Sequence, residues 1–188
     1  MGALSHIRVL DLTRVLAGPW CTQMLADLGA DVIKVERPGS GDDTRQWGPP
    51  FICPDGSGSE ESPYFLATNR GKRSITLNLS DPRGQRVINE LVPHCDVLVE
   101  NFKVGALARY GLDYETLKQL NPKLVYCSIT GFGQDGPYRD HPAFDDDTPH
   151  GQPLRRNALS VRCRHRDPRR RLVIEQRLPP ARACINEP

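Results

Sequence analysis

No apolar run in the sequence approaches the roughly 18 residues that a membrane-spanning helix needs. The first residues carry neither a basic cluster nor a long apolar segment, so they do not form a secretory signal. Mean hydropathy is −0.50 and 38% of the 188 residues are apolar, which is enough for a buried core. These absences predict a cytoplasmic protein without membrane association.

Metal-ligand spacing is also missing. None of the six cysteines belongs to a Cys-x-x-Cys pair, and the five histidines are scattered along the chain. We therefore expect no metal site. Free thiols are predicted for Cys21, Cys95 and Cys127, which lie in or beside apolar segments.

Two nucleotide-binding fingerprints are absent as well. No Gly-x-Gly-x-x-Gly follows the first apolar segment, and no Walker A sequence occurs. No Ser or Cys stands in a recognisable arrangement with a His and an acid, so a catalytic triad is not indicated. The commonest dinucleotide-binding and P-loop classes are thereby excluded.

The sequence does contain a regular alternation of apolar strands and helical segments up to residue 130. Strands are expected at 7–12, 32–36, 74–79, 96–100 and 124–129, and helices at 19–28, 82–92, 105–110 and 114–120. This alternation predicts an α/β fold with a doubly wound, mostly parallel Rossmann-like sheet. Residues 37–63, rich in Gly, Pro, Ser and Asp, are interpreted as a long loop.

The last segment has a different composition. Residues 151–188 contain ten arginines, no lysine and no aromatic residue. Beyond Asp145 neither a strand period nor a helix period is evident. We therefore predict that residues 146–188 form an irregular Arg/Pro-rich tail, either disordered or translated out of frame.

The predicted strands end in polar or glycine-rich turns at 13–18, 36–42, 100–105 and 130–136. In an open parallel sheet these turns share one edge, where ligands bind. Basic side chains in or near them would suit phosphate oxygens, or would be ordinary solvated charges: Arg14, Arg37, Arg45, Lys103, Arg109 and Arg139. Glu36, at a strand end, would suit a ribose hydroxyl. The residues alone predict a domain that binds an anionic ligand.

Several motifs in a fixed order are more specific. They are DLTRVLAGP at 11–19, ADVIKVERPGSGD at 30–42, NRGKRS at 69–74, DVLVENF at 96–102 and GFGQDGPY at 131–138. With these motifs, residues 6–145 resemble the N-terminal part of class III CoA-transferases, the CaiB/BaiF and formyl-CoA transferase family. Residues 41–51 resemble most the members that use succinyl-CoA and dicarboxylates.

The resemblance implies transfer of CoA from an acyl-CoA thioester to a carboxylic or dicarboxylic acid, without a prosthetic group, by interlocked homodimers. Residues 1–145 would be the CoA-binding N-terminal domain. The CoA contacts that it implies are Leu16, Ala17, Arg37, Leu77, Asn78, Asn101, Phe102, Lys103, Arg109, Gly136, Pro137, Tyr138 and Arg139.

The family's nucleophile is an Asp that attacks the thioester. It lies beyond a Pro-x-Phe-Asp motif, which corresponds to residues 142–145, and follows a Gly- and Met-rich apolar segment. That segment is missing here, so no catalytic residue is assigned. Asp167 lies at a suitable distance, but its arginine-rich surroundings do not match the family pattern. We therefore expect a truncated, inactive member of the family.

Three functions remain open on the sequence alone. Residues 6–145 favour a CoA-transferase, and the missing Asp favours a CoA- or nucleotide-binding fragment without catalysis. The third is an α/β domain whose basic tail binds nucleic acid. Ten arginines would attract phosphate, but the tail has no aromatic residue on which a base could stack, which argues against specific recognition.

Overall fold

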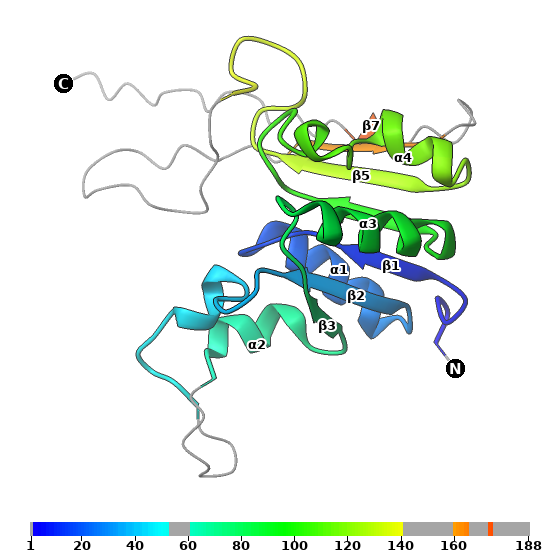
Figure 1. Cartoon of the computed structure of the whole chain (residues 1–188). Coiled ribbons are helices and arrows are strands. Elements are labelled where there is room, and N and C mark those ends of the chain that lie inside the picture. The colour runs from blue at the N-terminus through cyan, green and yellow to red at the C-terminus, as the bar shows by residue number, and fades with distance from the viewer. Residues whose placement is uncertain (1, 53–60, 141–159, 166–172, 175–188) are drawn as a thin grey trace, which may run out of the picture.

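The computed structural model describes residues 2–52, 61–140, 160–165, 173 and 174. Its strands form one seven-stranded sheet in the order β3-β2-β1-β4-β5-β6-β7 (Figure 1). The first five strands are parallel, and the last two run antiparallel to their neighbours. The strands are β1 (Arg8–Asp11), β2 (Asp31–Glu36), β3 (Arg73–Thr76), β4 (Val97–Glu100), β5 (Val125–Thr130), β6 (Ser160–Arg164) and β7 (Val173–Ile174).

Helices lie on both faces of this sheet. Those described are α1 (Ala17–Asp27), α2 (Pro63–Asn69), α3 (Pro82–Leu91) and α4 (Tyr114–Leu120), with 3-10 turns η1 (Asp43–Gln46), η2 (Val92–His94) and η3 (Leu107–Tyr110). Helices α3 and α4 cover one face, whereas α1 covers the other and contacts α2 (Figure 1). The predicted doubly wound, mostly parallel α/β fold is confirmed. No helix in the described ranges is long and apolar enough to cross a membrane.

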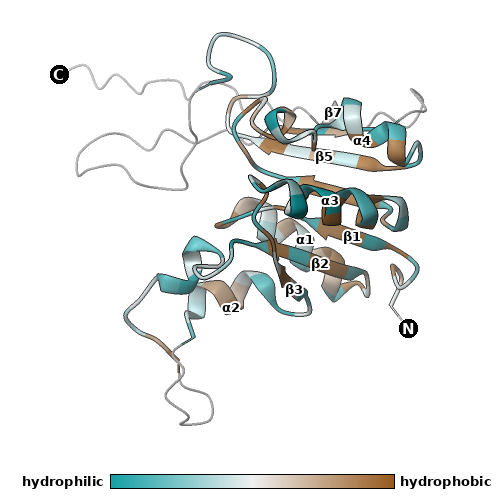
Figure 2. Cartoon of the chain, in the orientation of Figure 1, coloured by the Kyte–Doolittle hydropathy of each residue, from teal (hydrophilic) through white to brown (hydrophobic). Residues whose placement is uncertain are grey.

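The register of the parallel strands places apolar side chains side by side. Leu10 of β1 lies opposite Ile33 of β2 and Leu98 of β4, and all three are buried against α3 and α4. Val9 and Val32 are paired in the same way on the α1 face. Apolar residues therefore concentrate in the strands at the centre of the molecule, and polar residues prevail in the connecting loops (Figure 2). Parallel strands covered on both faces have this composition.

Local side chains fix where several helices begin. Asp81 and Asp113 each accept a hydrogen bond from a backbone N–H in the first turn of α3 and α4. Ser62 does the same for α2, and Pro63 occupies its first position. These are standard N-terminal caps, so the helix boundaries follow from the nearby sequence.

The structure also contains elements that the sequence pattern does not predict. Helix α2 is one, although Ser62-Pro63 is a typical helix start. The segment interpreted as one long loop contains η1 and a bridge between Ile52 and Glu61. In the predicted irregular tail, residues 160–164 and 173–174 form β6 and β7. Asp167 lies outside the described residues, as do 146–159, 166, 168–172 and 175–188.

Candidate functional site

The residues expected to bind CoA lie at the carboxyl edge of the parallel sheet. Leu16 lies between β1 and α1, Ala17 is the first residue of α1, and Arg37 follows β2. The remaining ones follow the next three strands: Leu77 and Asn78 after β3, Asn101, Phe102, Lys103 and Arg109 after β4, and Gly136, Pro137, Tyr138 and Arg139 after β5. In parallel sheets this edge is where ligands bind.

The turn between β1 and α1 begins at a buried carboxylate. Asp11 Oδ1 accepts hydrogen bonds from the backbone N–H and the hydroxyl of Thr13. Its Oδ2 accepts from Thr22 Oγ1 at 2.6 Å and from Lys72 Nζ at 3.0 Å. Burial lowers the pKa of the Lys72 ammonium, and the negative charge of Asp11 opposes that effect. The carboxylate thus ties the end of β1 to α1 and to the segment before β3.

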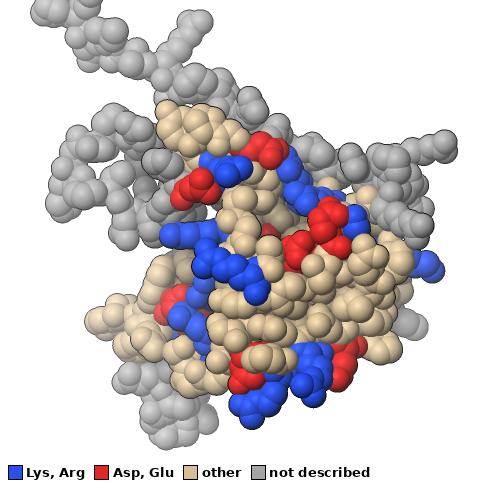
Figure 3. Space-filling view, turned by 45° about the horizontal axis from the view of Figure 1, so that its top comes forward, with Lys and Arg blue, Asp and Glu red and all other residues tan. Residues whose placement is uncertain are grey.

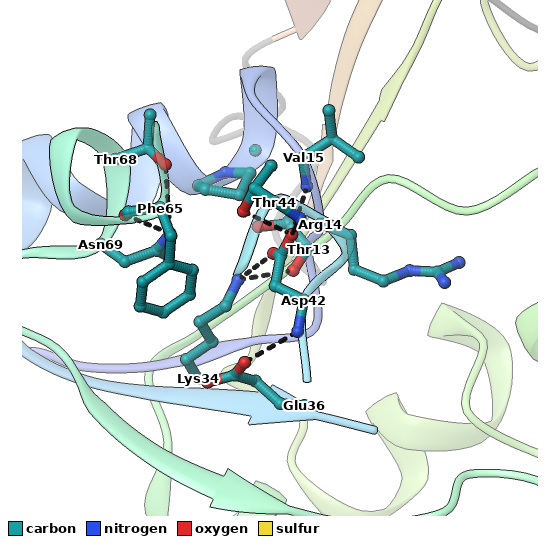
Figure 4. Close-up of polar contacts among 12 residues, drawn as sticks. Thr13, Arg14, Val15, Lys34, Glu36, Asp42, Thr44, Phe65, Thr68 and Asn69 are labelled. Atoms are coloured by element: carbon teal, nitrogen blue, oxygen red, sulfur yellow. Dashed lines mark hydrogen bonds and ion pairs between the residues drawn. The ribbon is translucent and has the colours of Figure 1, made fainter. Parts of the chain in front are cut away.

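A second buried ion pair supports the same turn from the loop after β2 (Figure 4). Lys34 Nζ donates to Asp42 Oδ2 at 2.8 Å and to the carbonyl oxygen of Thr13 at 3.0 Å. Asp42 Oδ1 accepts from the N–H of Thr44 at 3.0 Å and of Val15 at 3.3 Å. Burial alone would raise the pKa of the Asp42 carboxyl, but Lys34 and these hydrogen bonds outweigh it and lower that pKa.

Glu36 and Arg45 form an ion pair with each other. Glu36 Oε2 accepts from Arg45 Nε at 2.7 Å and from the Asp42 N–H at 2.8 Å, and its Oε1 accepts from Arg45 Nη2 and Ser74 Oγ. The Arg45 guanidinium also lies 3.7 Å from the centre of the Phe65 ring. Against the cost of burial, these bonds lower the pKa of Glu36 to about 2. Glu36, considered above for a ribose hydroxyl, and Arg45, considered for a phosphate, are thus engaged with each other in this structure.

Asn101 contacts the backbone of the turn. Its Oδ1 accepts from the N–H of Arg14 at 2.9 Å, and its Nδ2 donates to the carbonyl oxygen of Arg14 at 2.7 Å. The Arg14 guanidinium lies over the Phe102 ring, 4.9 Å from its centre. Asp43 forms ion pairs with both Arg14 and Arg37. The structure thus brings together predicted site residues from the turns after β1, β2 and β4.

Two basic residues that were predicted to contact CoA are not engaged by other side chains in the described part of the chain. Lys103 and Arg109 are exposed, and neither side chain forms a hydrogen bond or ion pair within the described part of the chain. The hydroxyl of Ser80 lies 3.2 Å from that of Tyr110, which joins the loop after β3 to η3. The segment after β4 therefore presents two exposed cations at the carboxyl edge of the sheet, the edge at which the β1–α1 turn lies.

The loop that contains Gly136–Arg139 is attached elsewhere. Asp135 forms an ion pair with Arg162 of β6, and the rings of Phe132 and Tyr138 are 6.0 Å apart. The described contacts thus connect this loop to the antiparallel end of the sheet. On the face drawn in Figure 3, the Lys and Arg residues of the described part of the chain lie in small groups beside Asp and Glu, without a continuous basic surface of the kind typical of a nucleic-acid site.

The profile of CoA-transferase family III matches residues 4–148 of this sequence. The chain belongs to that family. It is 61% identical over 142 residues to the succinate–glutarate CoA-transferase of Agrobacterium fabrum, covering 76% of this chain and 36% of that protein. The human succinyl-CoA:glutarate CoA-transferase is 53% identical over 142 residues, again 76% of this chain but 31% of the human protein.

Comparison with solved structures identifies the same family. A CaiB/BaiF family protein from Brucella suis has a TM-score of 0.72 and 56% identity, covering 77% of this chain and 37% of that one. The chain therefore spans about a third of the length of the curated relatives it matches. The family resemblance inferred from the motifs is confirmed.

The motifs did not reveal which residues fix the turn. Asp11, Lys34, Asp42 and Lys72 lie in the family-like segments, but the sequence analysis assigned them no role. One signal was available, because Lys34 is a charged residue inside the apolar strand DVIKVE and its side chain is 1% exposed. A charge in such a strand is buried only with a partner.

Proposed function

We propose that residues 4–148 bind the CoA part of a short acyl-CoA thioester, as the CoA-binding portion of a CoA-transferase for dicarboxylic acids. The observation that carries this is the fixed β1–α1 turn, which lies at the same carboxyl edge of the sheet as the segments that carry Arg37, Lys103 and Arg109. CoA bears three phosphate groups, which guanidinium and ammonium groups bind through charge-assisted hydrogen bonds. The names of the relatives support succinyl-CoA as donor and a dicarboxylate as acceptor.

We further propose that this chain binds without transferring. Transfer in the family needs an unengaged carboxylate to attack the thioester. Asp11, Glu36 and Asp42, the buried acids next to the turn, all accept hydrogen bonds from cations and backbone groups, so they suit structural roles. Binding without a positioned nucleophile does not stabilise the transition state.

CoA binding can be measured by isothermal titration calorimetry on the full chain. Arg37→Ala alone should weaken binding about 10-fold or more, and its combination with Arg109→Ala about 100-fold or more, because each charge-assisted contact contributes roughly 1.5–3 kcal/mol. The matched control is Arg8→Ala with Arg73→Ala, which removes the same charge at the opposite edge of the sheet. Equal affinities for the site and control variants would refute the proposal.

Turnover needs a separate assay. The protein is incubated with succinyl-CoA and a panel of dicarboxylates, and mass spectrometry monitors new thioesters and adducts on the protein. We expect neither. A CoA adduct on Asp167 that disappears in Asp167→Ala would instead show that the chain is an active transferase.

A further inference from the structure

Val15 has a backbone conformation that its side chain disfavours. Its φ is 71°, and it is the only non-glycine residue with positive φ in the described ranges. A β-branched residue in this region is an outlier, because its Cβ substituents crowd the neighbouring backbone. Such a conformation persists only where the surroundings impose it.

Hydrogen bonds from two different segments hold the backbone around Val15 in this conformation. On one side, Asn101 bonds both the N–H and the carbonyl oxygen of Arg14. On the other, the N–H of Val15 donates to Asp42, whose carboxylate is itself held by Lys34. These groups come from the segments after β4 and β2, so tertiary contacts, rather than local preference, set the turn.

The position of the strained residue is informative. Val15 directly precedes Leu16 and Ala17, which are expected to contact CoA. Asn101 was also expected to contact CoA, but both polar atoms of its side chain are engaged with Arg14. Asn101 thus holds the peptide groups on both sides of Arg14, which gives it a route to the ligand through the backbone of the turn.

We propose that Asn101 and Asp42 are positioning residues that hold Val15 in its left-handed conformation, so that Leu16 and Ala17 meet CoA without prior rearrangement. This inference rests on the proposed CoA binding. A preorganised turn spares the complex the ordering cost that a mobile turn would incur on binding. If Asn101 is removed, Val15 relaxes toward negative φ and displaces the two contact residues.

A double-mutant cycle between Val15 and Asn101 tests this, with CoA affinity as the readout. Asn101→Ala alone should weaken CoA about 10-fold or more. In the Val15→Gly background the same change should cost about 3-fold or less, because glycine adopts positive φ without being held. Val15→Gly alone should leave thermal stability unchanged or higher, since it removes the strain.

Asn121→Ala is the matched control. Asn121 also holds backbone groups through its side chain: its Nδ2 donates to the carbonyl oxygens of Val92 and Cys95, which precede β4 at the opposite edge of the sheet. Its effect on CoA affinity should be small, and the same in both backgrounds. If Asn101→Ala weakens CoA equally in both backgrounds, Asn101 contacts CoA directly and the positioning role is refuted.

These measurements also distinguish a failure of the positioning role from a failure of the proposed CoA binding. If the unmodified protein does not bind CoA, the proposed function fails and the positioning role fails with it. If the protein binds CoA and the Arg37→Ala, Arg109→Ala variant weakens it, but the cycle is additive, only the positioning role is refuted.

Discussion

Lys34 and Asp42 form an ion pair of 2.8 Å that is closed to solvent, with side-chain exposures of 1% and 0%. Lys34 belongs to β2 and Asp42 to the loop that follows it. Their interaction closes that loop back onto the strand and brings Asp42 to the N–H of Val15. The ion pair therefore links the core of the sheet to the candidate CoA-binding turn.

Asp42→Asn should lower the free energy of unfolding by about 3–5 kcal/mol, because it leaves the buried Lys34 ammonium without its counter-charge. Urea denaturation followed by circular dichroism measures this. Asp43→Asn is the control, since the adjacent Asp43 pairs with arginines at the surface and should cost less than about 1 kcal/mol. Similar losses in the two variants would contradict the structural role of the buried pair.

Glu36 should make stability depend on pH in the acid range. Its pKa is about 2 in the folded protein, against an ordinary value of 4.5, so the folded state binds the proton more weakly than the unfolded state. Its contribution is then complete above about pH 4.5 and is lost as pH falls toward 2. The difference between these two pKa values corresponds to a contribution of about 3 kcal/mol to the free energy of unfolding.

Urea midpoints measured between about pH 2 and 7 would show this loss. In Glu36→Gln the decline below about pH 4.5 should be shallower, and Arg45→Met should act in the same direction because Arg45 is the chief partner of Glu36. Parallel curves for the unmodified protein and Glu36→Gln would mean that Glu36 is not the group responsible.

Gly84→Ala should destabilise the protein, contrary to helix propensity. At an exposed position inside a helix, replacing Gly by Ala raises the free energy of unfolding by up to about 1 kcal/mol. A Cβ at Gly84, however, would lie 2.2 Å from the carbonyl oxygen of Asn78, so α3 would have to move away from the loop after β3. We expect a loss of about 1–3 kcal/mol in thermal denaturation. Arg86→Ala, on an exposed position of the same helix, should stay within about 0.5 kcal/mol.

Cys127 and Cys163 should form a disulfide on mild oxidation. They are directly opposite each other in the antiparallel pair of β5 and β6. Opposite residues in such a pair are about 4.5–5.5 Å apart at Cα, which a disulfide can span. A hydrogen bond with Cys127 lowers the pKa of the Cys163 thiol and so favours the reactive thiolate.

With hydrogen peroxide as oxidant, the two thiols would give up two electrons and two protons, and peroxide would be reduced to water. Peptide mapping by mass spectrometry should find the Cys127–Cys163 link and an unmodified Cys95, which is buried among apolar side chains on the other face of the sheet. Cys163→Ser should abolish the link. Without the link in the unmodified protein, β6 does not pair with β5 in solution.

The sequence alone determined the fold class and the family, and it predicts where the candidate site lies. Strand and helix periods are local properties, and caps such as Asp81-Pro82 lie within a few residues of the helices that they start. The turns that follow parallel strands must share one edge, so the predicted position of the candidate ligand site follows from topology. The same local reasoning could have found α2, because Ser62-Pro63 is a helix start.

Only the tertiary structure decided which charged groups are engaged and which remain exposed. Arg37, Arg45 and Arg109 look alike in the sequence, yet Arg45 is committed to Glu36 whereas Arg109 is exposed. The φ of Val15 likewise depends on Asn101, whose side chain bonds Arg14 across 87 residues of sequence. Such contacts form only when distant segments pack together, and their strength depends on burial that no local pattern encodes.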